Sequence, residues 1–248
     1  MSETGALPAT ALARGPAGGA IAFAMTFPTV LTLAYFVLLA GQPRWIVQGV
    51  YGVGKTVQFA FPALWVAFAT GRMPRLARPG TRGVLPGLVF GIALLVGALA
   101  LAQLVLQPAG ILEGAPAQAV RAKMASFGVD TLPRYAALGA FYSVIHAAAE
   151  EYYWRWFVFG ELRRACRPGW AVLWSSVAFA AHHVIILGAF LGYASPWTPL
   201  LAAAVGAGGA YWAWLYQRSG SLVGPWLGHL MADAAIFVIG YRLAFAAP

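Results

Sequence analysis

Two adjacent acidic residues, Glu150 and Glu151, lie inside a long apolar segment, and Arg155 follows the second by four residues. The whole chain has only seven acidic residues among its 248, so their placement in apolar surroundings needs an explanation. The i,i+4 spacing lets Glu151 pair with Arg155 on one face of a helix, whereas Glu150 points about 100° away. We therefore expect Arg155 to hold Glu151 structurally, and Glu150 to be available as a general base.

Other ionisable residues inside apolar segments are four histidines, one aspartate and one lysine: His146, His182, His183, His229, Asp233 and Lys55. Such residues normally face a bundle interior or a wet cavity in membrane proteins. At about 1.5 Å per residue, Glu150, His183, His229 and Asp233 lie at roughly similar depths of 12–20 Å from one end of their segments. Three separate helices thus place ionisable groups in one layer, and we expect them to form one polar site.

Two of the histidines have a simpler interpretation. His146 precedes Glu150 by four residues, and His182 is rotated by about 100° from His183 on a helix. We expect both to form hydrogen bonds between helices at the edge of the site, with a lipid-side position as the alternative for His182.

The composition predicts how these residues are positioned. The chain is 61% hydrophobic and 9% charged, against about 25% charged in soluble domains, and its mean hydropathy is +0.73. These values predict an all-α, polytopic membrane bundle of about seven helices, with eight as the alternative. The expected spans are 20–41, 46–70, 83–106, 133–161, 170–191, 197–217 and 221–243. Residues 112–133 are too polar to span, and we expect a short amphipathic helix there on the membrane surface.

The basic residues suggest an orientation. If seven spans alternate, one side carries nine of them: Arg14, Arg72, Arg75, Arg78, Arg82, Arg163, Arg164, Arg167 and Arg218. The other side carries five: Arg44, Arg121, Lys123, Arg134 and Arg242. The positive-inside rule then places the N-terminus in the cytoplasm, and the composition favours a bacterial inner membrane. We find no nucleic-acid-binding motif, and the single cysteine, Cys166, excludes an intrachain disulfide.

We divide the chain into a short cytoplasmic tail (1–19), N-terminal membrane helices with a surface loop (20–132) and a catalytic membrane core (133–245). The first apolar run is long enough to span, so we expect an uncleaved first helix. Residues 49–56 match the phosphate-binding pattern GxxxxGK[ST]. The motif works only between a strand and a helix of an α/β domain, so we expect no nucleotide binding. Its lysine, Lys55, then snorkels or lines the cavity.

Three motifs on successive late segments resemble the CPBP family, the CAAX-protease and bacteriocin-processing group of intramembrane endopeptidases, which includes abortive-infection proteins. They are EExxxR at 150–155, FxxxH at 179–183 within SSVAFAAHH, and HxxxD at 229–233 within GSLVGPWLGHLMAD. The resemblance covers about residues 133–245. It implies that Glu150 with His183 activates water and that His229 with Asp233 stabilises the oxyanion, while Glu151, Arg155 and Phe179 give structural support.

Two points stay open in the sequence. Eukaryotic CAAX-type members often carry Asn where this chain has Asp233, and a carboxylate cannot donate a hydrogen bond to an oxyanion. Glu150, His183 and His229 also suit zinc, although we favour a glutamate-activated water without metal. The expected partners are the bilayer and a membrane-associated protein or peptide substrate. A proton-coupled transporter and a non-catalytic immunity or binding protein of the same fold are the alternatives.

Overall fold

The computed structural model describes residues 16–71 and 79–245, and the regular structure within these ranges is helical. Most of the expected N-terminal tail, with Arg14, and the loop residues Arg72, Arg75 and Arg78 lie outside the described residues. In chain order the helices are α1 (Pro16–Leu33), α2 (Arg44–Thr70), α3 (Val84–Leu101), α4 (Ala115–Phe127), α5 (Leu132–Ala140), α6 (Ala147–Glu151), α7 (Gly160–Ala165), α8 (Pro168–Leu191), α9 (Trp197–Ser219) and α10 (Val223–Phe245). Stretches of π-helix extend or join them at Ala34–Leu38, Ala102–Leu106, Phe141–His146 and Tyr152–Phe159.

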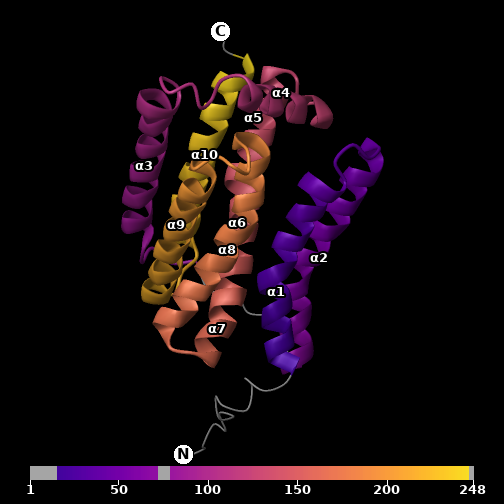
Figure 1. Cartoon of the computed structure of the whole chain (residues 1–248). Coiled ribbons are helices and arrows are strands. Elements are labelled where there is room, and N and C mark those ends of the chain that lie inside the picture. The colour runs from indigo at the N-terminus through magenta and orange to yellow at the C-terminus, as the bar shows by residue number, and fades with distance from the viewer. Residues whose placement is uncertain (1–15, 72–78, 246–248) are drawn as a thin grey trace, which may run out of the picture.

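The long helices run between two ends of an elongated bundle, and successive ones alternate in direction (Figure 1). Helices α5, α6 and α7 form one nearly continuous rod, because the π-helical stretches join them. Four described helical segments are long and apolar enough to cross a membrane: Ala17–Leu38, Val84–Leu106, Pro168–Leu191 and Val223–Phe245. The expected helical membrane protein is therefore confirmed, while the count of seven or eight spans stays a prediction.

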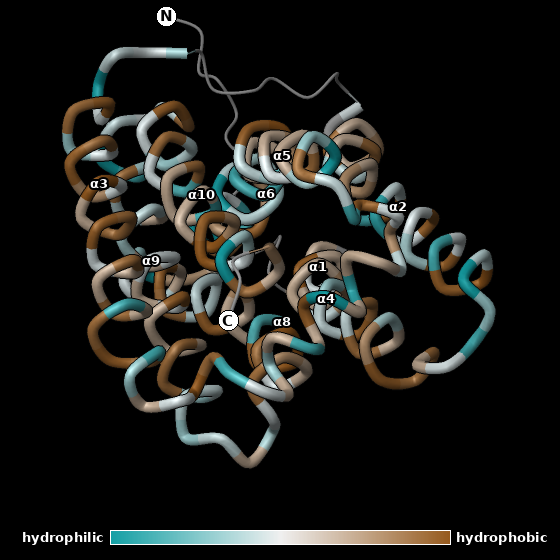
Figure 2. The backbone as a smooth tube through the Cα atoms, turned by 90° about the horizontal axis from the view of Figure 1, so that it is seen from above, coloured by the Kyte–Doolittle hydropathy of each residue, from teal (hydrophilic) through white to brown (hydrophobic). Residues whose placement is uncertain are grey.

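Apolar side chains on the outside of the bundle fit this assignment. Phe68, Leu85 and Leu104 are 81%, 71% and 72% exposed, which suits contact with hydrocarbon and not with water. Viewed from above, the outward turns of α3 are strongly hydrophobic, whereas hydrophilic stretches lie in the interior near α6, α8 and α10 (Figure 2). Part of the polarity of the bundle thus lies in its interior, beside α6, α8 and α10.

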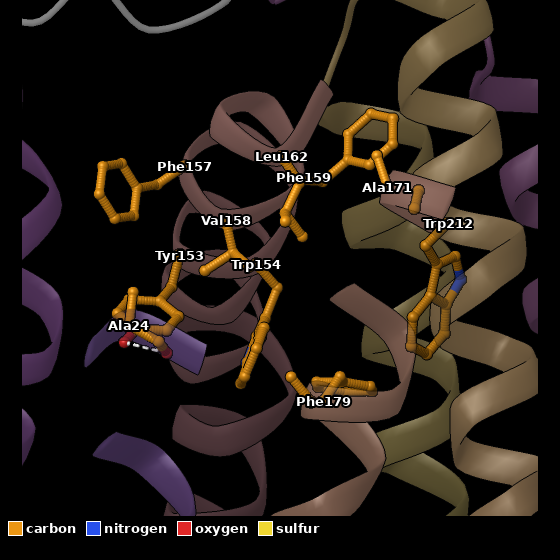
Figure 3. Close-up of a cluster of buried hydrophobic side chains, with 12 residues drawn as sticks. Ala24, Tyr153, Trp154, Phe157, Val158, Phe159, Leu162, Ala171, Phe179 and Trp212 are labelled. Atoms are coloured by element: carbon orange, nitrogen blue, oxygen red, sulfur yellow. Dashed lines mark hydrogen bonds between the residues drawn. The ribbon is translucent and has the colours of Figure 1, made fainter. Parts of the chain in front are cut away.

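The largest apolar core lies around the π-helical stretch Tyr152–Phe159. Tyr153, Trp154 and Phe157 are at most 1% exposed, and they pack with residues of α1, α8 and α9 (Figure 3). The Tyr153 hydroxyl donates a 2.7 Å hydrogen bond to the Ala24 carbonyl of α1. This core holds the rod in place. Glu150 and Glu151 immediately precede the core stretch in the sequence and lie on the same rod.

Small residues let α3 and α10 approach closely. A Cβ added to Gly91 of α3 would lie 2.9 Å from the Gly228 Cα of α10, and Gly87 faces Gly224 in the same way. Backbones packed through small residues are typical of membrane helices. Helix α10, which carries His229 and Asp233, is therefore backed directly by α3.

A short helix, α4, is present within the stretch 112–133, at the end of the bundle where α5 begins (Figure 1), while its place on the membrane surface stays a prediction. The Lys123 ammonium of α4 lies 3.6 Å from the ring centre of Tyr35 and 4.5 Å from that of Phe36. Both rings belong to the π-helical extension of α1. Cation–π contacts thus attach α4 to the first helix.

Candidate active site

The rod formed by α5, α6 and α7 brings two glutamates into the bundle between its two π-helical stretches. Glu150 and Glu151 are 4% and 0% exposed, and Arg155 is 2% exposed. Short π-helical insertions inside α-helices are frequently found at functional sites. The rod therefore departs from a regular α-helix on both sides of Glu150 and Glu151.

Glu151 uses one oxygen for two partners. Its Oε1 lies 2.9 Å from Nη1 of Arg155, so the ion pair expected from the i,i+4 spacing is present. The same oxygen accepts a 2.8 Å hydrogen bond from Nδ1 of His229 on α10. Sequence reasoning treated Glu151 as a partner of Arg155 alone and missed this second bond. Glu151 therefore links the arginine to a histidine of the site.

Glu150 lies between two histidines. Its Oε1 is 3.9 Å from Nε2 of His146, and its Oε2 is 3.7 Å from Nε2 of His229. Both separations are longer than a hydrogen bond but short enough for electrostatic interaction. The expected neighbour relation with His146 is thus present, and the expected meeting with His229 is present as well.

His183 lies farther from Glu150 than His146 and His229 do. The two side chains interact electrostatically, but no ion pair within 4.0 Å joins them among the residues that the structure describes, which differs from the direct meeting that we expected. Nδ1 of His183 lies 2.9 Å from the Phe179 carbonyl oxygen. A carbonyl can only accept, so Nδ1 carries the proton and Nε2 is left as an acceptor in the neutral ring. Phe179 thus supports His183 through its backbone.

Asp233 completes the set on α10. Its Oδ1 lies 3.7 Å from Nε2 of His229, and its side chain is 25% exposed, the most open of the site carboxylates. The distance is too long for a hydrogen bond. Since Glu151 already holds Nδ1 of His229, the orientation of that ring does not depend on Asp233.

His182 points into the bundle. It is 5% exposed, which rules out the lipid-side alternative, and its ring stacks on Trp154 with 5.9 Å between ring centres. Its Nδ1 has no hydrogen-bond partner in the described part of the chain. His182 therefore lies beside the site, next to His183, without a defined polar contact.

Lys55 lies in the middle of α2, so the pattern at 49–56 is entirely helical and lacks the strand and loop of a phosphate-binding site. Its ammonium lies 5.3 Å from the ring centre of Phe59, and the Phe59 ring contacts that of His146 edge-on. Lys55 also interacts electrostatically with Glu150. Lys55 therefore lines the site from α2, which is one of the two positions expected for it; the other was snorkelling towards the membrane surface.

The donor atoms do not form a metal site as they are placed. Among the described residues, no three His, Cys, Asp or Glu side chains converge closely enough to hold an ion. Nδ1 of His183 and Nδ1 of His229 both make hydrogen bonds within the protein, which leaves Nε2 of each ring to face a water molecule or a metal ion. The preference for a glutamate-activated water over zinc at Glu150, His183 and His229 therefore stays a prediction.

Comparison with known proteins identifies the segment that contains all of these motifs. Residues 132–235 match the family model described as type II CAAX prenyl endopeptidase Rce1-like. This match confirms the resemblance to the CPBP family. No curated protein and no solved structure gave a significant match to the chain.

Proposed function

Because residues 132–235 match the family model described as type II CAAX prenyl endopeptidase Rce1-like, we propose that this chain is an intramembrane endopeptidase that hydrolyses a peptide bond of a membrane-associated protein or peptide. The observation that carries the proposal is the convergence of Glu150 and His229, from separate helices, with 3.7 Å between them in a buried site. Placing an isolated charge inside a membrane costs free energy, so ionisable side chains that converge there typically mark a functional site.

The proposed reaction begins at Glu150. Its carboxylate takes a proton from a water molecule as the water oxygen attacks the peptide carbonyl carbon. Nε2 of His183, an acceptor when the ring is neutral, orients that water through the second water hydrogen. The proton held by Glu150 then passes to the leaving nitrogen as the carbon–nitrogen bond breaks, which gives a carboxylic acid and an amine.

The developing oxyanion is stabilised from α10. When His229 carries a second proton, its Nε2–H is a donor that faces the space shared by Glu150 and Asp233, since Nδ1 is held by Glu151. Asp233 adds a second donor when it is protonated. Preorganised donors of this kind supply a large share of catalysis in buried sites, because they need no reorganisation during the reaction.

We also propose that the protein is a multi-pass protein of a bacterial inner membrane with its N-terminus in the cytoplasm. In support, the arginines of the α7–α8 connection and Arg218 at the end of α9 fall at one end of the bundle (Figure 1). That end is the cytoplasmic one by the positive-inside rule. Reporter fusions to the two ends of the chain test this orientation.

The test of the function is cleavage of membrane-anchored reporter proteins by purified enzyme in liposomes, with candidate substrates taken from proteins that keep an uncleaved terminus in a deletion strain. We expect Glu150→Ala and His183→Ala each to lower cleavage by about 10²–10⁴-fold, the usual contribution of a general acid–base group. Glu161→Ala is the matched control, because Glu161 lies on the same rod but pairs with Arg164 away from the site.

Three outcomes contradict the proposal or its mechanism. Full proteolysis by both variants would remove the assignment of Glu150 and His183. A proton-coupled flux in liposomes without any peptide cleavage would favour a transporter. Loss of cleavage on chelation, with recovery on adding zinc, would replace the metal-free mechanism.

A further inference from the structure

The ring of His229 is covered by an aromatic side chain that belongs to none of the three motifs. Trp212 of α9 stacks on it with 4.6 Å between ring centres and 15° between ring planes. Trp212 and His229 are 3% and 4% exposed. The contact is therefore buried, close and nearly parallel.

Two further contacts limit the same imidazole. Oε1 of Glu151 holds Nδ1 at 2.8 Å, and the Phe179 ring meets the imidazole edge-on at 5.9 Å and 85°. This hydrogen bond determines which edge of the ring faces Glu151, but hydrogen bonds tolerate some angular variation, so the ring plane can still tilt. The stacked indole limits this tilt and keeps Nε2 at 3.7 Å from both Glu150 and Asp233.

Trp212 is itself held in place. The Arg155 guanidinium lies 5.1 Å from the Trp212 ring centre and 4.6 Å from that of Phe179. Gly228, immediately before His229, leaves space for the indole, because a Cβ there would lie 2.6 Å from Nε1 of Trp212. The same arginine that pairs with Glu151 thus also supports the ring that covers His229.

We propose that Trp212 is a positioning residue for His229, which keeps the imidazole plane aligned so that Nε2 faces the reacting atoms. The proposal rests on the role of His229 in the proposed function. It predicts that Trp212 contributes to turnover and not to substrate affinity, since the indole acts through the histidine. It also predicts that Gly228 is required for its small size.

The experiment combines kinetics with nuclear magnetic resonance of protein labelled at histidine, in detergent micelles or nanodiscs. We expect Trp212→Leu to lower kcat by about 10–100-fold, the scale of a small misplacement of a reacting group, with KM changed less than about twofold. Trp212→Phe should restore most of kcat, because a flat ring is kept. Trp214→Leu, two residues along α9 and 43% exposed, should behave as the wild type.

The spectra give a readout that needs no substrate. The imidazole proton signals of His229, assigned through His229→Ala, lie in the shielding region of the indole and should move downfield in Trp212→Leu. An unchanged His229 signal, or a kcat within about twofold of the wild type, overturns the proposal. If the wild type cleaves no peptide, the proposed function fails, while the spectra still decide whether Trp212 covers His229.

A second variant guards against simple misfolding. Gly228→Ala should displace the indole and lower kcat in the same direction as Trp212→Leu. In a Trp212→Phe background the effect of Gly228→Ala should be smaller, because phenylalanine lacks the Nε1 that the new methyl group would meet. Additive effects of the two substitutions would show that they act separately, and would contradict the proposed contact.

Discussion

The segment 132–235 and the helices before it, α1, α2 and α4, both hold buried or half-buried cations, but they hold them differently. In the first, Arg155 is 2% exposed and lies 2.9 Å from a carboxylate oxygen. In the second, the Lys55 ammonium lies 5.3 Å from the Phe59 ring centre, and Lys123 of α4 lies 3.6 Å from the Tyr35 ring centre of the α1 extension. Neither lysine has an ion pair within 4.0 Å among the described residues.

The difference concerns how strictly each cation fixes its neighbours. The planar guanidinium of Arg155 directs its hydrogen bonds, whereas an ammonium over a ring is attracted without a strict direction. The polar network of 132–235 therefore holds its side chains in defined positions through directional contacts. The lysines contribute charge or attach one helix to another. We expect activity to depend steeply on the first and weakly on the second.

Glu151→Gln should break this comparison most severely. Glutamine cannot neutralise Arg155, and removing one partner of a buried ion pair typically costs about 3–5 kcal/mol. We expect that loss in the free energy of unfolding in detergent, together with loss of cleavage, since His229 loses its charged anchor. The double variant Glu151→Gln/Arg155→Met, without the unpaired cation, should recover much of the stability but not the activity. A single variant as stable as the wild type would show that Arg155 has another counter-charge.

Substitutions of Asp233 distinguish its role from that of Glu151, the other carboxylate next to His229. Because Glu151 already orients the ring, we expect the side chain at 233 to matter as a hydrogen-bond donor. Asp233→Asn, which always donates, should keep cleavage within about tenfold of the wild type. Its activity should also persist at alkaline pH, where the ionised aspartate cannot donate. Asp233→Leu should lose about 10²-fold or more, as when one oxyanion donor is removed.

Rates measured across the pH range separate the two possible roles. If Asp233 acted as a carboxylate that orients His229, the Asn variant would lose as much activity as the Leu variant. Its pH profile would then keep the alkaline limb of the wild type. Either result contradicts the donor role.

Glu150 and Glu151 also show how much of the site could be predicted from the sequence. The ion pair of Glu151 with Arg155 and the proximity of Glu150 to His146 follow from spacing, because a helix fixes which side chains four residues apart can meet. The layer of polar groups followed from depth along each helix. Both kinds of inference need only one helix at a time.

Contacts between helices were beyond that reasoning. The bond between Glu151 and His229 depends on the rotation of α10 about its axis, which small residues such as Gly228 set by close packing against α3. The π-helical stretches on either side of α6 also change the angle between successive side chains. For this reason we expected His183 as the direct neighbour of Glu150, whereas the structure places His146 and His229 nearer.

Lys55→Met tests whether α2 contributes to the site through charge. Lys55 interacts electrostatically with Glu150 but makes no ion pair with it among the described residues. We therefore expect a moderate loss of cleavage, about 3–10-fold, as for a charge acting across partly solvated space. Lys55→Arg should be nearly as active as the wild type. A loss as large as that of Glu150→Ala would place Lys55 among the reacting groups and would erase the contrast between the two regions.

Lys123 should give the smallest effect, and its sign can be worked out from burial. Partial burial lowers the pKa of Lys123 from 10.5 to about 8, although the rings beneath it favour the charged form. Since the unfolded chain binds the proton more tightly, the burial cost of the ammonium is fully present below pH 8. This cost disappears as the pH rises towards 10.5.

The measurement is the difference in free energy of unfolding between the wild type and Lys123→Met at several pH values. We expect this difference to shift in favour of the wild type between about pH 8 and 10, by less than about 1 kcal/mol, because solvent screens a half-buried charge. Cleavage activity should be the same in both proteins. A shift in the opposite direction would mean that the Tyr35 and Phe36 rings outweigh desolvation, and that the ammonium form anchors α4.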